Sequence, residues 1–158
     1  MLDIRFKNGG LSSKLSNLYP YRFEIDGFIM ESYEGFIQSL RTNNIIEKQK
    51  LWKMYGYPAW KYAQQFDWTI EQKLYWNDKE YDRHSNEYTE LIKYSYDCLF
   101  ENIDFKNSLK ESIGDNLDHS IGSTNPYKTI LTKKEFLDNL NRLRDKLNPP
   151  KFYNLFDI

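Results

Sequence analysis

The sequence predicts an α+β fold, mainly helical, in one domain with a small antiparallel β element near the N-terminus. The length of 158 residues suits a single domain. Asp26-Gly27, between two short apolar runs, is a strong signal for a two-residue hairpin. After that hairpin, apolar residues recur mostly at helical spacing. We assign residues 1–148 to the domain and residues 149–158 to a C-terminal tail.

The first predicted elements are short. Ile4 and Phe6 predict an opening strand, which a loop follows. Residues 23–25 and 28–30 are the two strands of the hairpin, and Asp26-Gly27 is its turn. This hairpin is the small β element of the predicted fold.

A helix is predicted directly after the hairpin, with Ser32 as its N-cap. Glu34, Gln38 and Arg41 share one face of this helix, since they are three or four residues apart. Another face carries an apolar stripe at the spacing i, i+3, i+4 and i+7, formed by Tyr33, Phe36, Ile37 and Leu40.

The remaining chain is predicted to be mainly helical. Short helices are expected over residues 46–55, 58–65 and 105–112, and a longer one is expected after Ser85. The last helix begins at a capping box, Thr132-Lys133-Lys134-Glu135, and ends at Pro149-Pro150. A further capping box, Thr69-Ile70-Glu71-Gln72, is expected to open a segment toward Trp76.

Composition excludes several classes of protein. The single cysteine, Cys98, rules out an internal disulfide framework and favours a reducing, cytoplasmic compartment. We expect no secretory signal, because no basic-then-apolar leader is present, and no membrane partner, because no apolar run nears the roughly 18 residues of a membrane span. The abundance of Asn, Lys, Tyr and Ile suggests an AT-rich genome, either bacterial or phage.

Charge is unevenly distributed, although the formal net charge is only -1. Residues 67–118 contain 6 basic and 13 acidic side chains, whereas residues 46–66 contain 4 basic and 1 acidic. Residues 128–151 contain 7 basic and 3 acidic side chains. The two basic stretches would accommodate a polyanion such as DNA or RNA if they lie side by side. Alternatively, they are ordinary solvated helix faces.

Glu34 is the first candidate for catalysis. With Ser32 as N-cap, it lies in the first helical turn, where the helix dipole favours the ionised carboxylate. An ionised carboxylate suits a general base or a group that stabilises an oxocarbenium ion. The alternative is an ordinary acidic residue that stabilises the start of the helix.

A second group of candidates lies in loops. The Asn17 amide can donate to and accept from a phosphate or ribose oxygen, or simply shape its loop. Tyr19, Tyr21 and Trp76 can stack a nucleobase or belong to the core.

The polar loop 114–126 is long enough to suggest function, and it contains Asp118, His119 and Gly122. Asp118 is a candidate second acid or ribose ligand, and His119 is a candidate acid or a solvated side chain. Arg41 and Arg83 can each meet a pyrophosphate or form an ion pair.

Several kinds of site are missing from the sequence. It has no Gly-rich phosphate loop, no dinucleotide fingerprint and no nucleophile-elbow serine. His84, His119 and Cys98 are too few for a dedicated zinc site. We therefore expect no metal and no cofactor, which leaves acid–base chemistry or binding alone.

Two segments resemble the NADAR (YbiA-like) N-glycosidase family. Leu15-Ser16-Asn17-Leu18 before a proline is similar to one family motif, and Ser32-Tyr33-Glu34 is similar to its Ser-x-Glu motif. Gln38 fits the family's helix, and looser similarity extends to residue 147. The chain departs from the family at Gly35, where many members have His, and at Ile121, where many have Trp.

The resemblance implies a metal-independent hydrolase of N-glycosidic bonds that removes ADP-ribose from guanine in modified DNA or RNA. Glu34 would be the catalytic carboxylate and Asp118 the second acidic group. Asn17 would hold the ADP-ribose, and Trp76 would shape the pocket. Two alternatives are the same chemistry on riboflavin-pathway intermediates and a non-catalytic ADP-ribose-binding module. The oligomeric state stays open, with residues 151–158 as a candidate docking segment.

Overall fold

The elements of residues 1–147, which the computed structural model describes, confirm the predicted α+β class. Three two-stranded sheets accompany the helices: β1 (Leu2–Asp3) pairs with β6 (Leu117–Asp118), β2 (Phe23–Ile25) with β3 (Phe28–Met30), and β4 (Lys73–Trp76) with β5 (Lys79–Asp82). The helices are α1 (Gly10–Lys14), α2 (Tyr33–Ser39), α3 (Ile45–Trp52), α4 (Gly56–Ala63), α5 (Asn86–Leu99), α6 (Ile103–Glu111) and α7 (Lys133–Leu147).

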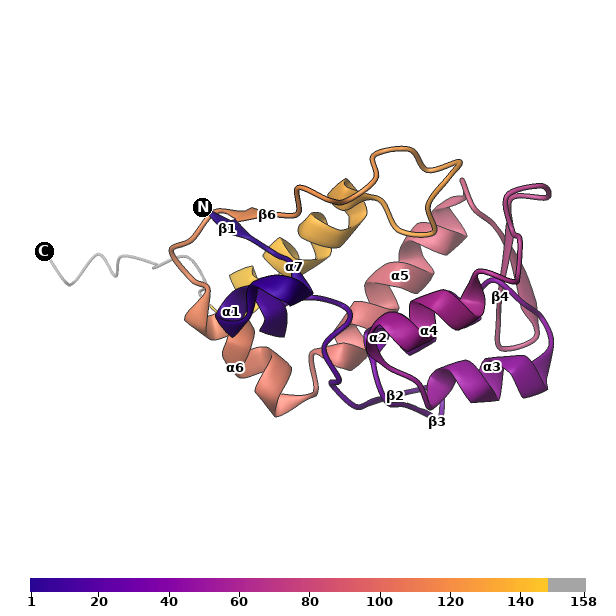
Figure 1. Cartoon of the computed structure of the whole chain (residues 1–158), viewed down its shortest axis with the longest axis horizontal. Coiled ribbons are helices and arrows are strands. Elements are labelled where there is room, and N and C mark those ends of the chain that lie inside the picture. The colour runs from indigo at the N-terminus through magenta and orange to yellow at the C-terminus, as the bar shows by residue number, and fades with distance from the viewer. Residues whose placement is uncertain (148–158) are drawn as a thin grey trace, which may run out of the picture.

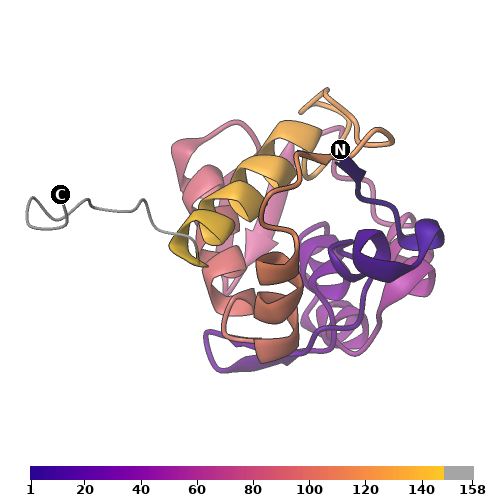
Figure 2. The same ribbon diagram turned by 90° about the vertical axis from the view of Figure 1, so that its left-hand side faces the viewer.

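The helices form two groups. Figure 2 shows α5, α6 and α7 on one side, and the N-terminal segment with α1 to α4 on the other. The segment between β6 and α7, orange in Figure 1, extends past α5 before it returns to α7. Within residues 1–147 no helix is both long enough and apolar enough to span a bilayer.

The core is aromatic and joins the two groups. The rings of Tyr33 on α2 and Tyr96 on α5 stack with centroids 4.1 Å apart, and both side chains are at most 1% exposed. Trp76 packs edge-on against Phe36 with centroids 5.1 Å apart. The predicted apolar face of α2 is therefore buried in the core, where it meets the face of α5 that carries Tyr96.

Local signals placed several elements correctly. Asp26 and Gly27 both have positive φ, as their two-residue turn requires. The Ser32 and Ser85 side chains cap α2 and α5. The predicted capping box at Thr132 is present, because its backbone N–H donates to Glu135 Oε1 at 2.7 Å and its Oγ1 accepts from the Glu135 N–H at 3.1 Å.

Other predictions of local structure were wrong. The opening strand ends at Asp3, and Phe6–Asn8 form a short 3₁₀ helix, although Ile4 is buried as expected. The expected loop before Tyr21 contains α1, which begins at Gly10, and both Gly10 and the preceding Gly9 have positive φ. The start of α4 at Gly56 was placed two residues too late.

The capping box predicted at Thr69 does not form. Asp67 Oδ1 instead accepts hydrogen bonds from the Thr69 N–H and hydroxyl, at 2.9 and 2.6 Å, and this fixes a turn. The chain then enters a hairpin whose turn residues, Asn77 and Asp78, have φ of 50° and 63°. The predicted helix end at 149–150 and the tail 149–158 lie outside the described residues.

Candidate functional site

A cavity of ≈ 430 Å³ lies between the N-terminal segment, α2, α4 and the segment that leads into α7. Its size is that of a small-molecule site. Five of the residues predicted from sequence line it, and they come from three separate parts of the chain: Asn17, Glu34, Gln38, His119 and Gly122.

Glu34 lies in the first turn of α2 and is only 8% exposed. Burial raises the pKa of Glu34 to about 7, although the hydrogen bond from Gln38 and the charge of Arg41 act in the opposite direction. The helix dipole therefore does not keep this carboxyl fully ionised, because loss of solvent outweighs it. A carboxyl with a pKa near neutrality suits proton transfer.

The neighbours of Glu34 in the Ser-x-Glu-Gly segment have structural roles. Ser32 Oγ accepts from the Gly35 N–H and donates to the Met54 carbonyl, both at 2.9 Å. A Cβ on Gly35 would lie 2.4 Å from the Leu51 carbonyl oxygen, so this position needs glycine. These contacts pack α2 against the end of α3. The Glu34 carboxyl takes no part in them.

Gln38 lies one turn after Glu34 and is 4% exposed. Its Nε2 donates to Glu34 Oε1 at 2.8 Å. Its Oε1 is buried and has no hydrogen-bond partner within residues 1–147. Since buried acceptors are normally satisfied and Gln38 is a lining residue of the cavity, this oxygen suits a donor on a ligand, such as a ribose hydroxyl.

Asn17 is fixed from two sides. Its backbone carbonyl accepts from the Glu34 N–H at 3.1 Å, and its Oδ1 accepts from the Tyr96 hydroxyl at 3.0 Å. Burial holds the pKa of Tyr96 well above its ordinary value, so this phenol keeps its proton and donates. The Asn17 amide nitrogen is therefore the group that can donate to a ligand.

His119 is held by the backbone of the N-terminal segment. Its Nδ1 lies 2.7 Å from the Ile4 carbonyl oxygen. A carbonyl only accepts, so Nδ1 carries the proton and Nε2 is left for other contacts. Gly122 allows this arrangement, because a Cβ there would lie 2.7 Å from His119 Cδ2.

The cavity residues that were missed from sequence include one charged and two large aromatic side chains: Arg5, Tyr57 and Trp60. Tyr57 and Trp60 are three residues apart on α4 and are 60% and 41% exposed. Their spacing of three residues near the start of a predicted helix places both rings on one face, and this was a signal in the sequence. Because the chain is rich in aromatic residues, however, such rings are more often assigned to the core. Arg5 carried no local signal.

Asp118 does not line the cavity. It lies in β6, and Lys133 Nζ contacts its Oδ1 at 2.7 Å. That hydrogen bond lowers the pKa of Asp118, as does the Asp118 contact with the His119 backbone. The carboxylate is thus used in an ion pair that joins β6 to α7, which argues against its predicted role as the second acid.

Trp76 and Tyr21 belong to the core and not to the cavity. Trp76 is 2% exposed, and its Nε1 donates to Asp26 Oδ2 at 2.7 Å. The Tyr21 hydroxyl is 2.9 Å from Ser108 Oγ, and its ring contacts the half-buried Tyr19 with centroids 4.7 Å apart. Stacking of a ligand on these three rings, as predicted, is therefore not supported.

The two predicted arginines also lie away from the cavity lining. Arg41 donates to the Phe66 carbonyl at 3.2 Å. Burial lowers the pKa of Arg41. Arg83 is 3% exposed and pairs with Glu135. Arg83 is therefore neutralised inside the protein, and neither arginine lines the cavity of Glu34.

Many basic side chains of the two basic stretches are used internally. Lys48 is buried and donates to the Ser39 and Tyr75 carbonyls, and burial lowers the pKa of Lys48 to about 7. Arg142 pairs with Asp97 at 2.6 Å. The net positive charge of these stretches is therefore weak support for a polyanion surface. No group of three or more His, Cys, Asp or Glu side chains within residues 1–147 is arranged to hold a metal ion.

The comparisons with known proteins decide the family. The family model described as bacteriophage protein GP30.3 matches residues 9–145. The chain belongs to the bacteriophage GP30.3 family. It is also 32% identical over 149 residues to an uncharacterized 17.1 kDa protein in the Gp30-rIII intergenic region of Enterobacteria phage T4, covering 92% of this chain and 98% of that protein. No solved structure matches the chain.

Membership of the GP30.3 family corrects the assignment to the NADAR family, which was wrong. The similarity rested on two short motifs, and the structure explains one of them by packing: Ser32 and Gly35 join α2 to α3. Of the two origins suggested by composition, the phage family supports the phage alternative. The GP30.3 match includes all the cavity residues discussed above except Arg5.

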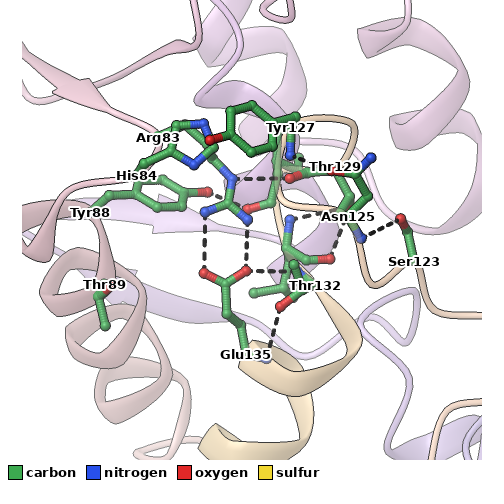
Figure 3. A network of polar contacts seen from close by, with 12 residues as sticks. Arg83, His84, Tyr88, Thr89, Ser123, Asn125, Tyr127, Thr129, Thr132 and Glu135 are labelled. Carbon is green, nitrogen blue, oxygen red and sulfur yellow. Dashed lines mark hydrogen bonds and ion pairs between the residues drawn. The ribbon is translucent and has the colours of Figure 1, made fainter.

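In this GP30.3-family fold, a buried polar network holds one wall of the cavity (Figure 3). The Arg83 guanidinium contacts both Glu135 carboxylate oxygens, at 2.7 and 3.2 Å, and its Nε donates to the Thr129 carbonyl at 3.0 Å. The Tyr88 hydroxyl donates to the Ile130 carbonyl at 2.5 Å. Since residues 129–132 line the cavity, Arg83 and Tyr88 hold the backbone of this part of its wall.

We expect Glu135→Gln to destabilise the protein by about 3 kcal/mol, because it leaves the Arg83 charge buried and unpaired. This is the lower end of the usual range, since the Glu135 side chain is 24% exposed. The amide oxygen can still accept from Thr132, so the helix cap is kept. Urea unfolding measures the change. Asp138→Asn on the same helix is the control, since it removes only the exposed pair with Lys134 and should have no measurable effect. Equal effects of the two variants would contradict the role of the network.

Proposed function

We propose that this protein is a hydrolase of N-glycosidic bonds that releases ADP-ribose from an ADP-ribosylated base, with ADP-ribosyl-guanine in nucleic acid as its substrate. The observation that carries this proposal is the Glu34 carboxyl, buried in the wall of the cavity with a pKa of about 7. The family does not supply this function, so the proposal depends on the site itself. A cytoplasmic location belongs to the same proposal.

The proposed reaction uses Glu34 as the base. The ionised carboxylate takes a proton from a water molecule while the water oxygen bonds to ribose C1′. The C1′–N bond breaks, and its electron pair stays on the nitrogen of the leaving base. That nitrogen then receives the proton from Glu34, which regenerates the carboxylate. The negative charge of Glu34 also stabilises the oxocarbenium character that develops at C1′.

Groups around Glu34 provide contacts for a sugar. Gln38 Oε1 lacks a donor within residues 1–147, and the Asn17 amide nitrogen can donate. The pair therefore matches vicinal ribose hydroxyls, each of which both donates and accepts. The His119 Nε2 offers a further contact in the same cavity.

The rate of hydrolysis is expected to rise with pH and to reach half of its maximum near pH 7. The reason is that the base form of Glu34 becomes populated as the pH passes its pKa of about 7. The measurement is kcat/KM between about pH 5.5 and 8.5, a range that brackets this pKa. A rate that falls across this range would assign Glu34 as an acid and contradict the proposed mechanism.

The second candidate is a module that binds ADP-ribose without cleaving it. One observation favours it: Asp118 is paired with Lys133 away from the cavity lining, so only one of the two predicted carboxylates is available. Such a module would be stabilised thermally by ADP-ribose but would form no product.

A product assay separates the candidates. The substrates are an oligonucleotide with ADP-ribosylated guanine and, in parallel, free riboflavin-pathway nucleotides. Release of ADP-ribose by the wild type but not by Glu34→Gln supports the proposal. Cleavage of the riboflavin-pathway nucleotides alone would assign the same chemistry to the other substrate class. No cleavage at all, with ADP-ribose still raising the melting temperature, would leave the binding module.

A further inference from the structure

Tyr57 and Trp60 form an exposed aromatic pair at the cavity. Their rings stack with centroids 5.5 Å apart and an interplanar angle of 23°. Both residues line the cavity of Glu34. A stacked pair of large rings left 60% and 41% exposed is a surface on which a further ring can continue the stack.

Trp60 differs from the other tryptophans of the chain. Trp52, Trp68 and Trp76 are 7%, 3% and 2% exposed, so the fold buries each of them. Trp60 alone among the four keeps much of its indole at the surface. Trp60 is therefore the tryptophan that a ligand in the cavity can reach.

The backbone places this pair next to the residues that contact the sugar. A Cβ on Gly56, the first residue of α4, would lie 3.8 Å from the Leu18 carbonyl oxygen. The start of α4 is thus packed on the segment 16–18, which includes Asn17. Arg5 lines the same cavity and adds a positive charge.

We propose that Tyr57 and Trp60 form a stacking platform for the base of a nucleotide, with Arg5 as the contact for its phosphate. Stacking on aromatic rings suits any nucleobase, and a guanidinium suits phosphate. An apolar ligand would not need Arg5, Asn17 or the unpaired Gln38 oxygen in the same cavity. This inference rests on the proposed function only in naming ADP-ribose as the nucleotide.

Fluorescence tests the platform directly, because Trp60 is the exposed tryptophan. ADP-ribose is expected to quench the emission of both the wild type and Glu34→Gln. By calorimetry, Trp60→Ala should weaken ADP-ribose binding about 10-fold, which is the lower range of aromatic–base stacking. Trp60→Phe, which keeps a ring, should restore most of the affinity.

Two controls separate stacking from a general loss of structure. Tyr55→Ala removes a neighbouring aromatic residue that is 56% exposed but does not line the cavity, and it should leave the affinity unchanged. Ribose 5-phosphate has no base, so its binding should be insensitive to Trp60→Ala. Equal losses for ribose 5-phosphate and ADP-ribose would overturn the platform, as would unchanged ADP-ribose affinity in Trp60→Ala.

The test of the stacking platform is independent of the test for glycosidase activity. If the product assay is negative but ADP-ribose binding depends on Trp60, the glycosidase proposal fails and the platform stands. If product is released equally well, with unchanged KM, by Trp60→Ala, the platform fails and the glycosidase stands. Quenching by an unmodified single-stranded oligonucleotide but not by ADP-ribose would overturn the assignment to a free nucleotide.

Discussion

Glu34→Gln is expected to make the protein more stable at pH 8 and to remove turnover of the proposed substrate. The folded protein holds the pKa of Glu34 at about 7, against an ordinary value of 4.5. Ionisation therefore costs the folded state stability above pH 4.5, and the cost is complete above about pH 7. A pKa difference of this size corresponds to about 3 kcal/mol.

The direction of the stability change follows from the linkage between proton binding and folding. Below pH 4.5 the carboxyl is protonated in both states and carries no penalty. As the pH rises from 4.5 to about 7, the unfolded chain ionises first, so the wild type loses stability that the glutamine variant keeps. The variant should therefore match the wild type near pH 4 and exceed it at pH 8, by about 5–10 °C in melting temperature.

Calorimetric melting of both proteins at several pH values measures this difference. The amide oxygen introduced by Glu34→Gln can still accept from Gln38, so the local hydrogen bond survives. Turnover should fall by about 10²-fold or more, as for loss of a general base. A variant less stable than the wild type at pH 8 would show that the Glu34 carboxylate stabilises the fold, and its assignment as a site residue would lose its physical basis.

Gly35→Ala is expected to destabilise the protein by about 3 kcal/mol or more. The added methyl group would lie 2.4 Å from the Leu51 carbonyl and 2.8 Å from the Met54 carbonyl. Both contacts are with backbone, so no side-chain rotation relieves them, and α2 must move away from α3. Overpacking of this kind usually costs about 1–3 kcal/mol, and backbone contacts belong at the upper end.

Urea unfolding of Gly35→Ala, with Gly10→Ala as control, checks this prediction. A Cβ on Gly10 would meet nothing within 4 Å, so that variant suffers only from its φ of 54°, at about 1–2 kcal/mol. The difference between the unfolding free energies of the two variants measures the cost of the clash between residue 35 and the α3 backbone. Equal losses would show that α2 and α3 are packed less closely than the structure indicates.

Elements encoded by adjacent residues were predictable from the sequence. The Asp26-Gly27 turn, the Ser32 cap and the capping box of Thr132 with Glu135 each depend on hydrogen bonds or dihedral angles within a few residues. Where a competing local interaction was present, the same logic failed. The Thr69 segment forms a turn and not a capping box, because the Asp67 carboxylate accepts hydrogen bonds from the Thr69 N–H and hydroxyl.

The site was predictable only in part. Glu34 and Gln38 share a helix face, so their association followed from the helical period. His119 and Asn17 reach the same cavity through long-range contacts, with Ile4 and Tyr96, that no local pattern encodes. For Asp118 and Arg83, the sequence offered a charge but could not show that Lys133 and Glu135 already neutralise it.

By itself the sequence determined the fold class, the Asp26-Gly27 turn, the caps at Ser32, Ser85 and Thr132, and the helical face that carries Glu34, because these depend on spacing along the chain. Only the tertiary structure decided which aromatic rings and charges remain available to a ligand. Trp76 is buried while Trp60 is exposed, and burial, not helix position, sets the pKa of Glu34. The physical reason is that exposure and solvation depend on what packs against a side chain from distant parts of the chain.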